Sequence, residues 1–483
     1  MMDLLSFNSV ILIIVILVGF YMAWNIGAND VANAMGTSVG SGALTMKRAV
    51  IIAAILEFSG AFLVGSHVTD TVRKGIIDPQ LFLGSPEILM FGMLGALLAA
   101  AVWLQIATFF GLPVSTTHSI IGAIIGFALV AGGSGAVAWP KVSKIVASWV
   151  VSPLMGGIIS FFIFNFIKTK MLNVANPIKA TRRLSPYLVF AVFFILTLVM
   201  VFKGLKQLNL DLEFSEALLL AGVVGSITAI ISYFLIRWYL NQRKELDHNS
   251  LVRNENSIEM THKLRKMKRL LTKSYVHADK ETLERLNKIS EDVETCLTDV
   301  KKTRFDKVQE EKSYQVVERV FIFLQILSAC FVAFAHGAND VANAIGPMAA
   351  VISIIETGTV VMKVPVPLWV LGLGGIGIVI GLATWGWRVI ETIGKKITEL
   401  TPTRGFSAEF GAATTIVIAS KLGLPISTTH TLVGSVLGVG MARGVASLNM
   451  IMVRNILLSW FVTLPAGGLL SILFYYLFKS ILL

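Results

Sequence analysis

The sequence predicts an all-α polytopic membrane protein made of two homologous, inverted repeats with broken helices. The chain has 483 residues, of which 55% are hydrophobic and 14% charged, and its mean hydropathy is +0.76. Apolar runs of about 20 residues recur along it, the length that a helix needs to cross the hydrocarbon of a bilayer. The runs are continuous and do not alternate in polarity, which argues against a β-barrel. About 10–12 transmembrane helices would account for the apolar sequence.

Two motifs each occur twice, in the same order, which indicates an internal duplication. GANDVANAMG at Gly27–Gly36 recurs as GANDVANAIG at Gly337–Gly346, an offset of 337 minus 27, or 310. GLPVSTTH at Gly111–His118 recurs as GLPISTTH at Gly423–His430, an offset of 423 minus 111, or 312. A period this long is typical of two homologous halves and not of a solenoid. We expect the halves to be inverted, as in many secondary transporters.

The first membrane half is predicted to cover residues 1–240. Its first apolar run has no basic residue before it and no small-residue cleavage pattern after it, so we expect a retained span and not a signal peptide. The loop Lys168–Arg183 carries five basic residues and no acidic one, which places it on the cytoplasmic side. The apolar runs of this half are Val10–Trp24, Ala49–Gly65, Ile88–Phe110, Val142–Ile167, Leu184–Phe202 and Glu216–Leu240.

Residues 241–315 are predicted to form a cytoplasmic helical insertion, either a structured linker or a regulatory domain. Charged residues occur throughout it, and no apolar run is long enough to span a membrane. An amphipathic helix is expected from apolar residues three or four apart, namely Leu283, Leu286, Ile289, Val293, Leu297 and Val300. The charges of the insertion nearly balance, and the net charge of +12 is explained by basic loops, so no nucleic-acid partner is predicted.

The second membrane half is predicted to cover residues 316–483. Its apolar runs are Val316–Ala335, Leu368–Trp387, Ser407–Lys421, Ile451–Leu464 and Gly467–Phe478. The only two cysteines, Cys296 and Cys330, lie in a polar and an apolar segment, so neither a disulfide framework nor a bound metal cofactor is predicted.

The GLPxSTTH motifs predict two helix starts that can bind an anion. Gly111 and Pro113 interrupt an incoming helix, and the hydroxyl residues after them suit the start of a new one. A helix N-terminus presents free amide hydrogens and a partial positive charge. Pro425 repeats the construction in the second half. The candidate anion-binding residues are Ser115, Thr116 and Thr117 with their counterparts Ser427, Thr428 and Thr429.

The Asn-Asp motifs offer the opposite chemistry, that of a cation site at membrane depth. Carboxylates inside a membrane segment are functional candidates by default. The carboxylate and amide oxygens of Asp30, Asn33, Asp340 and Asn343 are hard ligands of the kind that Na⁺ prefers. Neither motif contains Lys or Arg, and burying uncompensated charge is costly. We therefore expect bound cations to neutralise the two aspartates and so allow an anion to bind nearby.

Other polar residues in the apolar sequence have two interpretations each. His118 and His430 could relay protons or orient neighbouring hydroxyls. Glu57 and Glu409 are candidates for coupling or for a structural role, and Gln105 is a weaker candidate of the same kind. The small residues around Asp30 also fit a simple packing role between membrane helices.

The duplicated GANDVANA and GLPxSTTH segments resemble those of the inorganic phosphate transporter (PiT) family of secondary carriers. The resemblance covers both membrane halves and implies an all-helical bundle of inverted repeats that can form a homodimer in the cell membrane. It implies a joint site for phosphate and cation, which adds Asn29 and Asn339 to the phosphate ligands. It also places functional acids at Glu57 and Glu409.

The resemblance leaves the coupling ion and the anion open, since the family includes sodium-coupled and proton-coupled members and a few sulfate carriers. The segment TVRKGIIDP at Thr71–Pro79 is similar to the sodium-coupled branch, so we expect Na⁺ symport without a further cofactor. The repeats also differ, because Ile26 aligns with His336 and Thr37 with Pro347, so the two sites are expected to be inequivalent. A membrane-embedded enzyme acting on phosphorylated substrates is disfavoured, because the sequence has no P-loop, HExxH or arranged nucleophile and base.

Overall fold

The computed structural model describes the residues 7–64, 76–77, 79–201, 212–241, 260, 263–272, 279–302, 304–361, 364, 366–421 and 426–482. Its chain divides into two compact units. Unit 1 comprises Met1–Asn165, Phe190–Ile227 and Phe321–Leu483, and unit 2 comprises Phe166–Val189 and Thr228–Val320. Four helices contribute residues to both: α7 (Trp139–Ile167), α8 (Pro177–Val199), α9 (Phe214–Asn241) and α12 (Arg304–Asp340).

The described chain is almost entirely helical, as predicted. Among the described residues the only β-structure is an isolated antiparallel bridge between Ile77 and Val137, and the rest of the non-helical chain forms turns and short loops. The remaining helices of the first half are α1 (Phe7–Asn29), α2 (Ala32–Gly40), α3 (Met46–Val64), α5 (Pro86–Phe109) and α6 (Thr116–Gly132). Those of the second half are α13 (Ala342–Thr357), α14 (Leu368–Trp385), α15 (Trp387–Glu391), α16 (Pro402–Lys421), α17 (Thr428–Arg443) and α18 (Met450–Leu482).

The duplication is visible in the helix starts. From α2 to α13 the first residue moves from 32 to 342, an offset of 310. From α6 to α17 it moves from 116 to 428, an offset of 312. From α7 to α18 it moves from 139 to 450, an offset of 311. The repeated motifs therefore begin repeated helices, and the chain is two copies of one helical pattern.

Eight helical segments among the described residues are long and apolar enough to cross a membrane. This number is smaller than the expected 10–12 because two of the eight, Phe7–Gly40 and Ser313–Thr357, each contain a helix pair interrupted within the motif. Helix α6 is apolar but short, and α3 carries Lys47, Arg48 and Glu57. The protein is therefore a multi-pass membrane protein.

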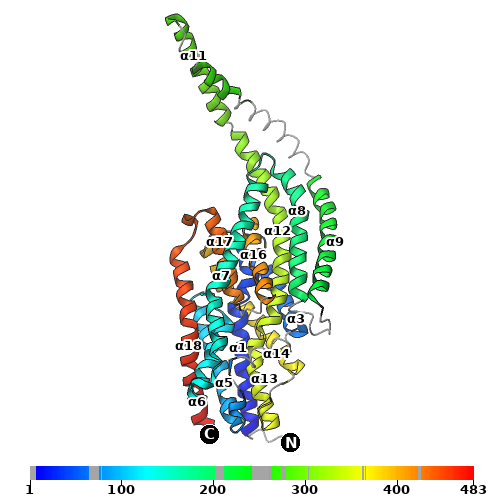
Figure 1. Ribbon diagram of the computed structural model, residues 1–483, viewed down its shortest axis with the longest axis vertical. Coiled ribbons are helices and arrows are strands. Elements are labelled where there is room, and N and C mark those ends of the chain that lie inside the picture. Colours follow the sequence, from blue (N-terminus) through cyan, green and yellow to red (C-terminus); the bar gives the residue numbers. More distant parts are fainter. Residues whose placement is uncertain are drawn as a thin grey trace. The chain divides into compact units, whose positions relative to one another are not determined.

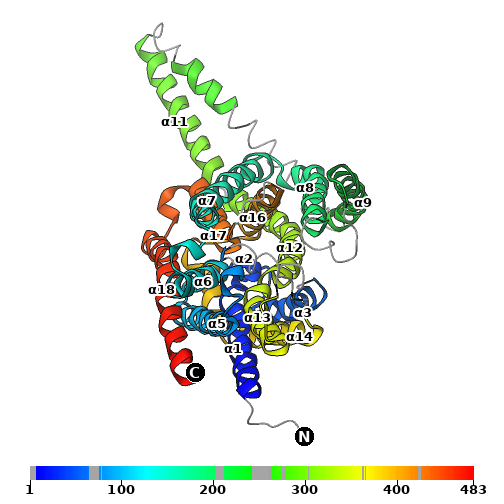
Figure 2. The same cartoon turned by 60° about the horizontal axis from the view of Figure 1, so that its bottom comes forward.

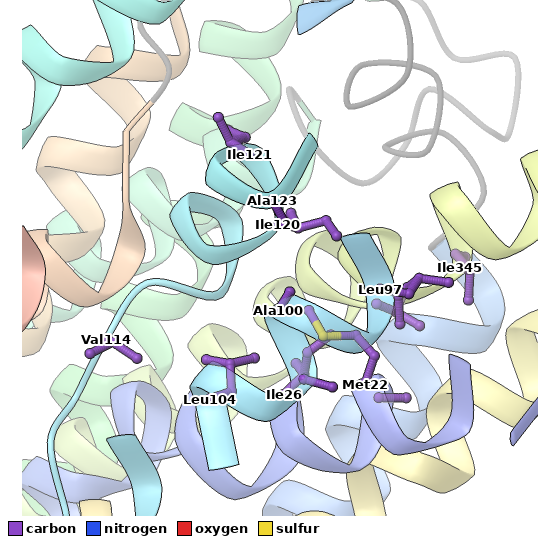
Figure 3. Close-up of a cluster of buried hydrophobic side chains, with 14 of the residues drawn as sticks. Met22, Ile26, Leu97, Ala100, Leu104, Val114, Ile120, Ile121, Ala123 and Ile345 are labelled. Atoms are coloured by element: carbon purple, nitrogen blue, oxygen red, sulfur yellow. The ribbon is translucent and has the colours of Figure 1, made fainter. Parts of the chain in front are cut away.

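Helices from the two repeats interlock in unit 1. Figures 1 and 2 show α18 of the second half beside α5 and α6 of the first, and α14 beside α1 and α3. The interior between α1, α5 and α6 is filled by apolar side chains, with Met22, Leu104 and Ile120 among those in Figure 3. Val114 of the GLPVSTTH segment belongs to the same cluster, so the loop that precedes α6 is anchored in the core.

Glycines of the Asn-Asp motifs lie where two helix backbones touch. A Cβ at Gly27 would lie 1.9 Å from the carbonyl oxygen of Ile378 in α14. A Cβ at Gly337, its counterpart, would lie 2.2 Å from the carbonyl oxygen of Glu57 in α3. Each motif thus packs against a helix of the other half. The small residues therefore have the expected packing role, which does not exclude a role of the same motif in binding.

Unit 2 contains the charged region between the halves. The predicted amphipathic helix is confirmed as α11 (Lys280–Lys302), in which Val293 is buried. Thr282 donates its backbone N–H to Asp279 Oδ1 at 3.2 Å, and hydrogen bonds with Thr282 hold the pKa of the Asp279 carboxyl below its ordinary value. Residues 241–315, the predicted insertion, fall inside this unit.

Candidate functional site

Both Asn-Asp motifs interrupt a helix at their aspartate. Helix α1 ends at Asn29 and α2 begins at Ala32, while α12 ends at Asp340 and α13 begins at Ala342. At the first break the N–H of Asn33 donates to the carbonyl of Asp30 at 2.9 Å, a tighter turn than that of an α-helix. A broken helix inside the membrane is tolerated where it lines a polar site.

Asp30 receives hydrogen bonds from both repeats. Thr116 Oγ1 donates to Asp30 Oδ2 at 2.6 Å, and Thr429 Oγ1 donates to Asp30 Oδ1 at 2.8 Å. Asn33 also donates to Asp30 Oδ1, as expected for residues three apart, and its Nδ2 lies 2.8 Å from Thr429 Oγ1. Through these bonds the buried carboxylate of Asp30 connects the start of α6 to the start of α17.

His336 joins the second motif to the first. Its Nε2 lies 2.7 Å from Asp340 Oδ2 and 3.7 Å from Asp30 Oδ2. Its Nδ1 lies 3.0 Å from both carboxylate oxygens of Glu57. Asp30, His336 and Asp340 each offer one ligand atom, all within 4.8 Å of one another. Three buried carboxylates, from α3, from the end of α12 and from the break after α1, thus meet around one imidazole.

The two predicted helix starts are confirmed. Ser115 is the N-cap of α6 and accepts the backbone N–H of His118 at 3.2 Å. Ser427 is the N-cap of α17 and accepts the backbone N–H of His430 at 3.2 Å. Before α6, Gly111 adopts φ 66°, a left-handed conformation that glycine reaches without strain. Residues Leu422–Pro425 of the second motif lie outside the described part of the chain.

The predicted asparagine ligands differ in their contacts. Asn29 bonds to Thr108 Oγ1 at 2.9 Å, to the carbonyl of Leu112 at 3.0 Å and to the N–H of Val114 at 3.1 Å, so it fastens the loop before α6 to α1. Asn343 Nδ2 donates at 3.2 Å to Thr116 Oγ1 and at 3.2 Å to Thr117 Oγ1.

Asn339 and Thr428 are half-buried residues beside the site. Asn339 Nδ2 donates to Asp340 Oδ1 at 2.9 Å. Asn339 and Thr428 also line an apolar pocket between α8, α12 and α16, together with Asn33, His336 and Glu409. The pocket therefore reaches both motifs and Glu409, and the binding roles of these residues stay predictions.

Glu409 lies in a separate group of hydroxyls on the same pocket. It accepts hydrogen bonds from Thr37, from Ser328 and, at 3.1 Å, from Ser38. No ion pair to this fully buried carboxylate occurs among the described residues. Glu57 of the first half therefore faces the motif helix of the second, and Glu409 of the second half faces α2 of the first.

The histidines of the two helix starts lie against each other. The rings of His118 and His430 are buried, with centroids 4.9 Å apart and planes at 75°. Gln105, the weaker candidate, is half-buried on α5, and its side chain makes no hydrogen bond with the described residues. The segment Thr71–Pro79, apart from Ile76, Ile77 and Pro79, lies outside the described residues.

The sequence interpretation missed His336 as a member of this group. Its signal was the break in the repeat pattern, since Ile26 occupies the equivalent place in the first copy. The hydroxyls of Thr37, Ser38 and Ser328 were also missed, because they are far apart in sequence and meet only around Glu409.

Comparisons with known proteins show the family to which the chain belongs. The chain matches the Phosphate transporter family over residues 26–471. It is 45% identical over 474 residues to "Inorganic phosphate transporter 2-1, chloroplastic" of Arabidopsis thaliana, covering 97% of this chain and 72% of that protein. A solved structure described as "The sodium-dependent phosphate transporter" is 40% identical, with a TM-score of 0.73, over 98% of this chain and 100% of the other. The chain therefore belongs to the phosphate transporter family.

Proposed function

We propose that this protein is a Na⁺-coupled phosphate symporter of the cell membrane that works by alternating access around a site shared by both repeats. The observation that carries the proposal is the convergence of Asp30 and Asp340 with the hydroxyls of two helix starts. The solved relative described as sodium-dependent supports the choice of coupling ion.

The chemistry of the group fits a cation and an anion bound together. The carboxylate and hydroxyl oxygens around Asp30 and Asp340 suit Na⁺, because hard cations prefer oxygen ligands. The amide hydrogens and hydroxyls at the starts of α6 and α17 suit the oxygens of phosphate. Bound Na⁺ offsets the repulsion between the anion and the aspartates, so neither ligand binds well alone. Obligatory co-binding is the physical basis of symport.

The crossed placement of Glu57 and Glu409 supports repeats that move against each other. Each glutamate comes from one half and contacts a helix that carries the Asn-Asp motif of the other. Relative movement of the halves would change the surroundings of both carboxylates, as coupling requires. An inverted relation between the repeats and the pairing of two copies in a homodimer remain predictions from the resemblance.

Uptake of labelled phosphate into proteoliposomes tests the proposal, with Na⁺ and H⁺ gradients imposed separately and sulfate as a competitor. We expect uptake to follow the Na⁺ gradient and to be insensitive to sulfate. Uptake driven by the H⁺ gradient alone would instead identify a proton-coupled permease, and strong competition by sulfate would identify a sulfate carrier. Accumulation that ignores both gradients would contradict symport altogether.

Asp30→Asn and Asp340→Asn test the role assigned to the aspartates. Both changes preserve side-chain volume and remove one negative charge, so we expect Na⁺-driven uptake to be lost while the protein still reaches the membrane. Wild-type dependence of uptake on Na⁺ in both variants would show that the two carboxylates are structural. Release of free phosphate from phosphorylated compounds by the reconstituted wild-type protein would favour the enzyme alternative.

A further inference from the structure

Two tryptophans outside the motifs occupy equivalent places in the repeats. Trp149 lies in α7 and Trp460 in α18, and their offset is 460 minus 149, or 311. This value falls between the offsets of the two motifs, so the tryptophans belong to the same duplication. They are the ring partners of the two histidines at the helix starts.

The four rings form one cluster, but the two halves of it differ. The Trp460 ring stacks on His430, with centroids 3.8 Å apart and planes at 18°. The Trp149 ring is tilted against His118, at 5.3 Å and 46°. The two histidines touch each other in the middle. The cluster therefore spans the gap between α6 and α17.

The indole hydrogen bonds differ more sharply than the ring contacts. Trp149 Nε1 donates to His118 Nε2 at 3.1 Å, which is a bond within one repeat. Trp460 Nε1 donates to the carbonyl of Pro113 at 3.0 Å, which joins the second repeat to the loop before α6 in the first. Both ring nitrogens of buried His430 lack a hydrogen-bond partner among the described residues.

We propose that Trp460 is a positioning residue that sets the separation between the two helix starts of the candidate site. It contacts His430, three residues after the N-cap of α17, and Pro113, two residues before the N-cap of α6. It acts through these contacts and reaches neither Asp30 nor Asp340. The inference rests on the proposed function, because that function assigns the helix starts to phosphate.

The inequality between the tryptophans also predicts an exchange. Under the proposed alternating access, two inverted repeats exchange conformations, so equivalent residues take each other's environments in the opposite-facing state. The Trp460 N–H then leaves Pro113 and donates to His430 Nε2, as Trp149 already does to His118. This move gives the unpartnered His430 nitrogen a donor, and buried polar groups are strongly disposed to find one.

Equilibrium binding of labelled phosphate to the purified full chain, at saturating Na⁺, tests the positioning role. Trp460→Phe keeps an aromatic ring but removes the N–H, and we expect phosphate to bind about fivefold more weakly, the loss of one buried hydrogen bond. Trp103→Phe is the control, because Trp103 Nε1 donates at 3.1 Å to Thr463 Oγ1, outside the cluster. This control should bind phosphate within about twofold of wild type.

A second substitution keeps the test decisive if Trp460→Phe fails to fold. Benzothienylalanine at position 460 replaces the N–H by sulfur at nearly constant shape and should reproduce the loss of affinity. If either folded variant binds phosphate as Trp103→Phe does, Trp460 is only structural and the inference is wrong, while Na⁺-dependent binding by wild type keeps the proposed function. If wild type binds no phosphate with Na⁺, the proposed function fails and the inference falls with it.

Fluorine NMR of protein labelled with 5-fluorotryptophan tests the exchange. The Trp460 resonance is identified by its absence in Trp460→Phe. We expect two positions for it, with populations that change when Na⁺ and phosphate are added together. A single position that is unaffected by the ligands would overturn the exchange.

Discussion

Replacing Thr429 by valine tests whether Asp30 is the point at which the two repeats meet functionally. Thr429 Oγ1 donates to Asp30 Oδ1 at 2.8 Å and lies 2.8 Å from Asn33 Nδ2. Valine has nearly the shape of threonine but lacks the hydroxyl, so it leaves the carboxylate oxygen facing a methyl group. It also removes an oxygen that could bind Na⁺ or phosphate.

The magnitude follows from the charge of the partner. A hydrogen bond to a charged group contributes about 1.5–3 kcal/mol, which corresponds to about 10- to 150-fold in affinity. Thr117, the counterpart of Thr429, accepts from Asn343 at 3.2 Å and bonds to no carboxylate among the described residues. Thr117→Val should therefore weaken binding only about two- to tenfold, as expected for a neutral hydrogen bond.

Na⁺-dependent binding of labelled phosphate to the purified variants measures both effects, with thermal unfolding in detergent to confirm that each is folded. The half-saturating Na⁺ concentration should rise more in Thr429→Val than in Thr117→Val. Equal losses in the two variants, or a larger loss in Thr117→Val, would refute the reasoning, because affinity would then not depend on the contact with Asp30.

Two further predictions concern packing and coupling. Gly27→Ala places a Cβ 1.9 Å from the carbonyl oxygen of Ile378. This clash should destabilise the fold by about 1–3 kcal/mol or more, which thermal unfolding measures. Gly222→Ala in α9 is the control, because a Cβ there would have nothing within 4 Å, and it should not lower the melting temperature. Glu409→Gln keeps the shape of a side chain that accepts hydrogen bonds from three hydroxyls, but it removes the negative charge. Na⁺-driven uptake should therefore fall by about tenfold or more, which corresponds to a loss of about 1.4 kcal/mol. The thermal stability of the variant should not fall. Unchanged uptake in Glu409→Gln would show that the carboxylate does not take part in coupling.

The helix starts of the candidate site could be predicted from the sequence. Pro113 and the hydroxyls after it predicted a helix start, and Ser115 is the N-cap found there, because capping depends only on residues a few positions apart. The duplication likewise predicted a second start at Thr428. The packing role of the motif glycines was an alternative interpretation, yet Gly27 and Gly337 both lie at helix crossings beside the candidate ligands. One motif can therefore serve close packing and binding together.

The sequence by itself determined the membrane class, the duplication, the helix starts and the identity of the polar residues, since hydropathy, repeat offset and capping are properties of the chain read locally. Only the tertiary structure decided which partners they take. His336 was visible as a break in the repeat, but its contacts with Glu57, Asp340 and Asp30 join residues up to about 300 positions apart. The sequence also gives no sign that Asp30 and Asp340, which occupy equivalent places in nearly identical motifs, form different hydrogen bonds. The same holds for the equivalent tryptophans Trp149 and Trp460. Two copies of one sequence can pack differently because each lies against the other and not against itself, so the inequality arises from packing between the repeats.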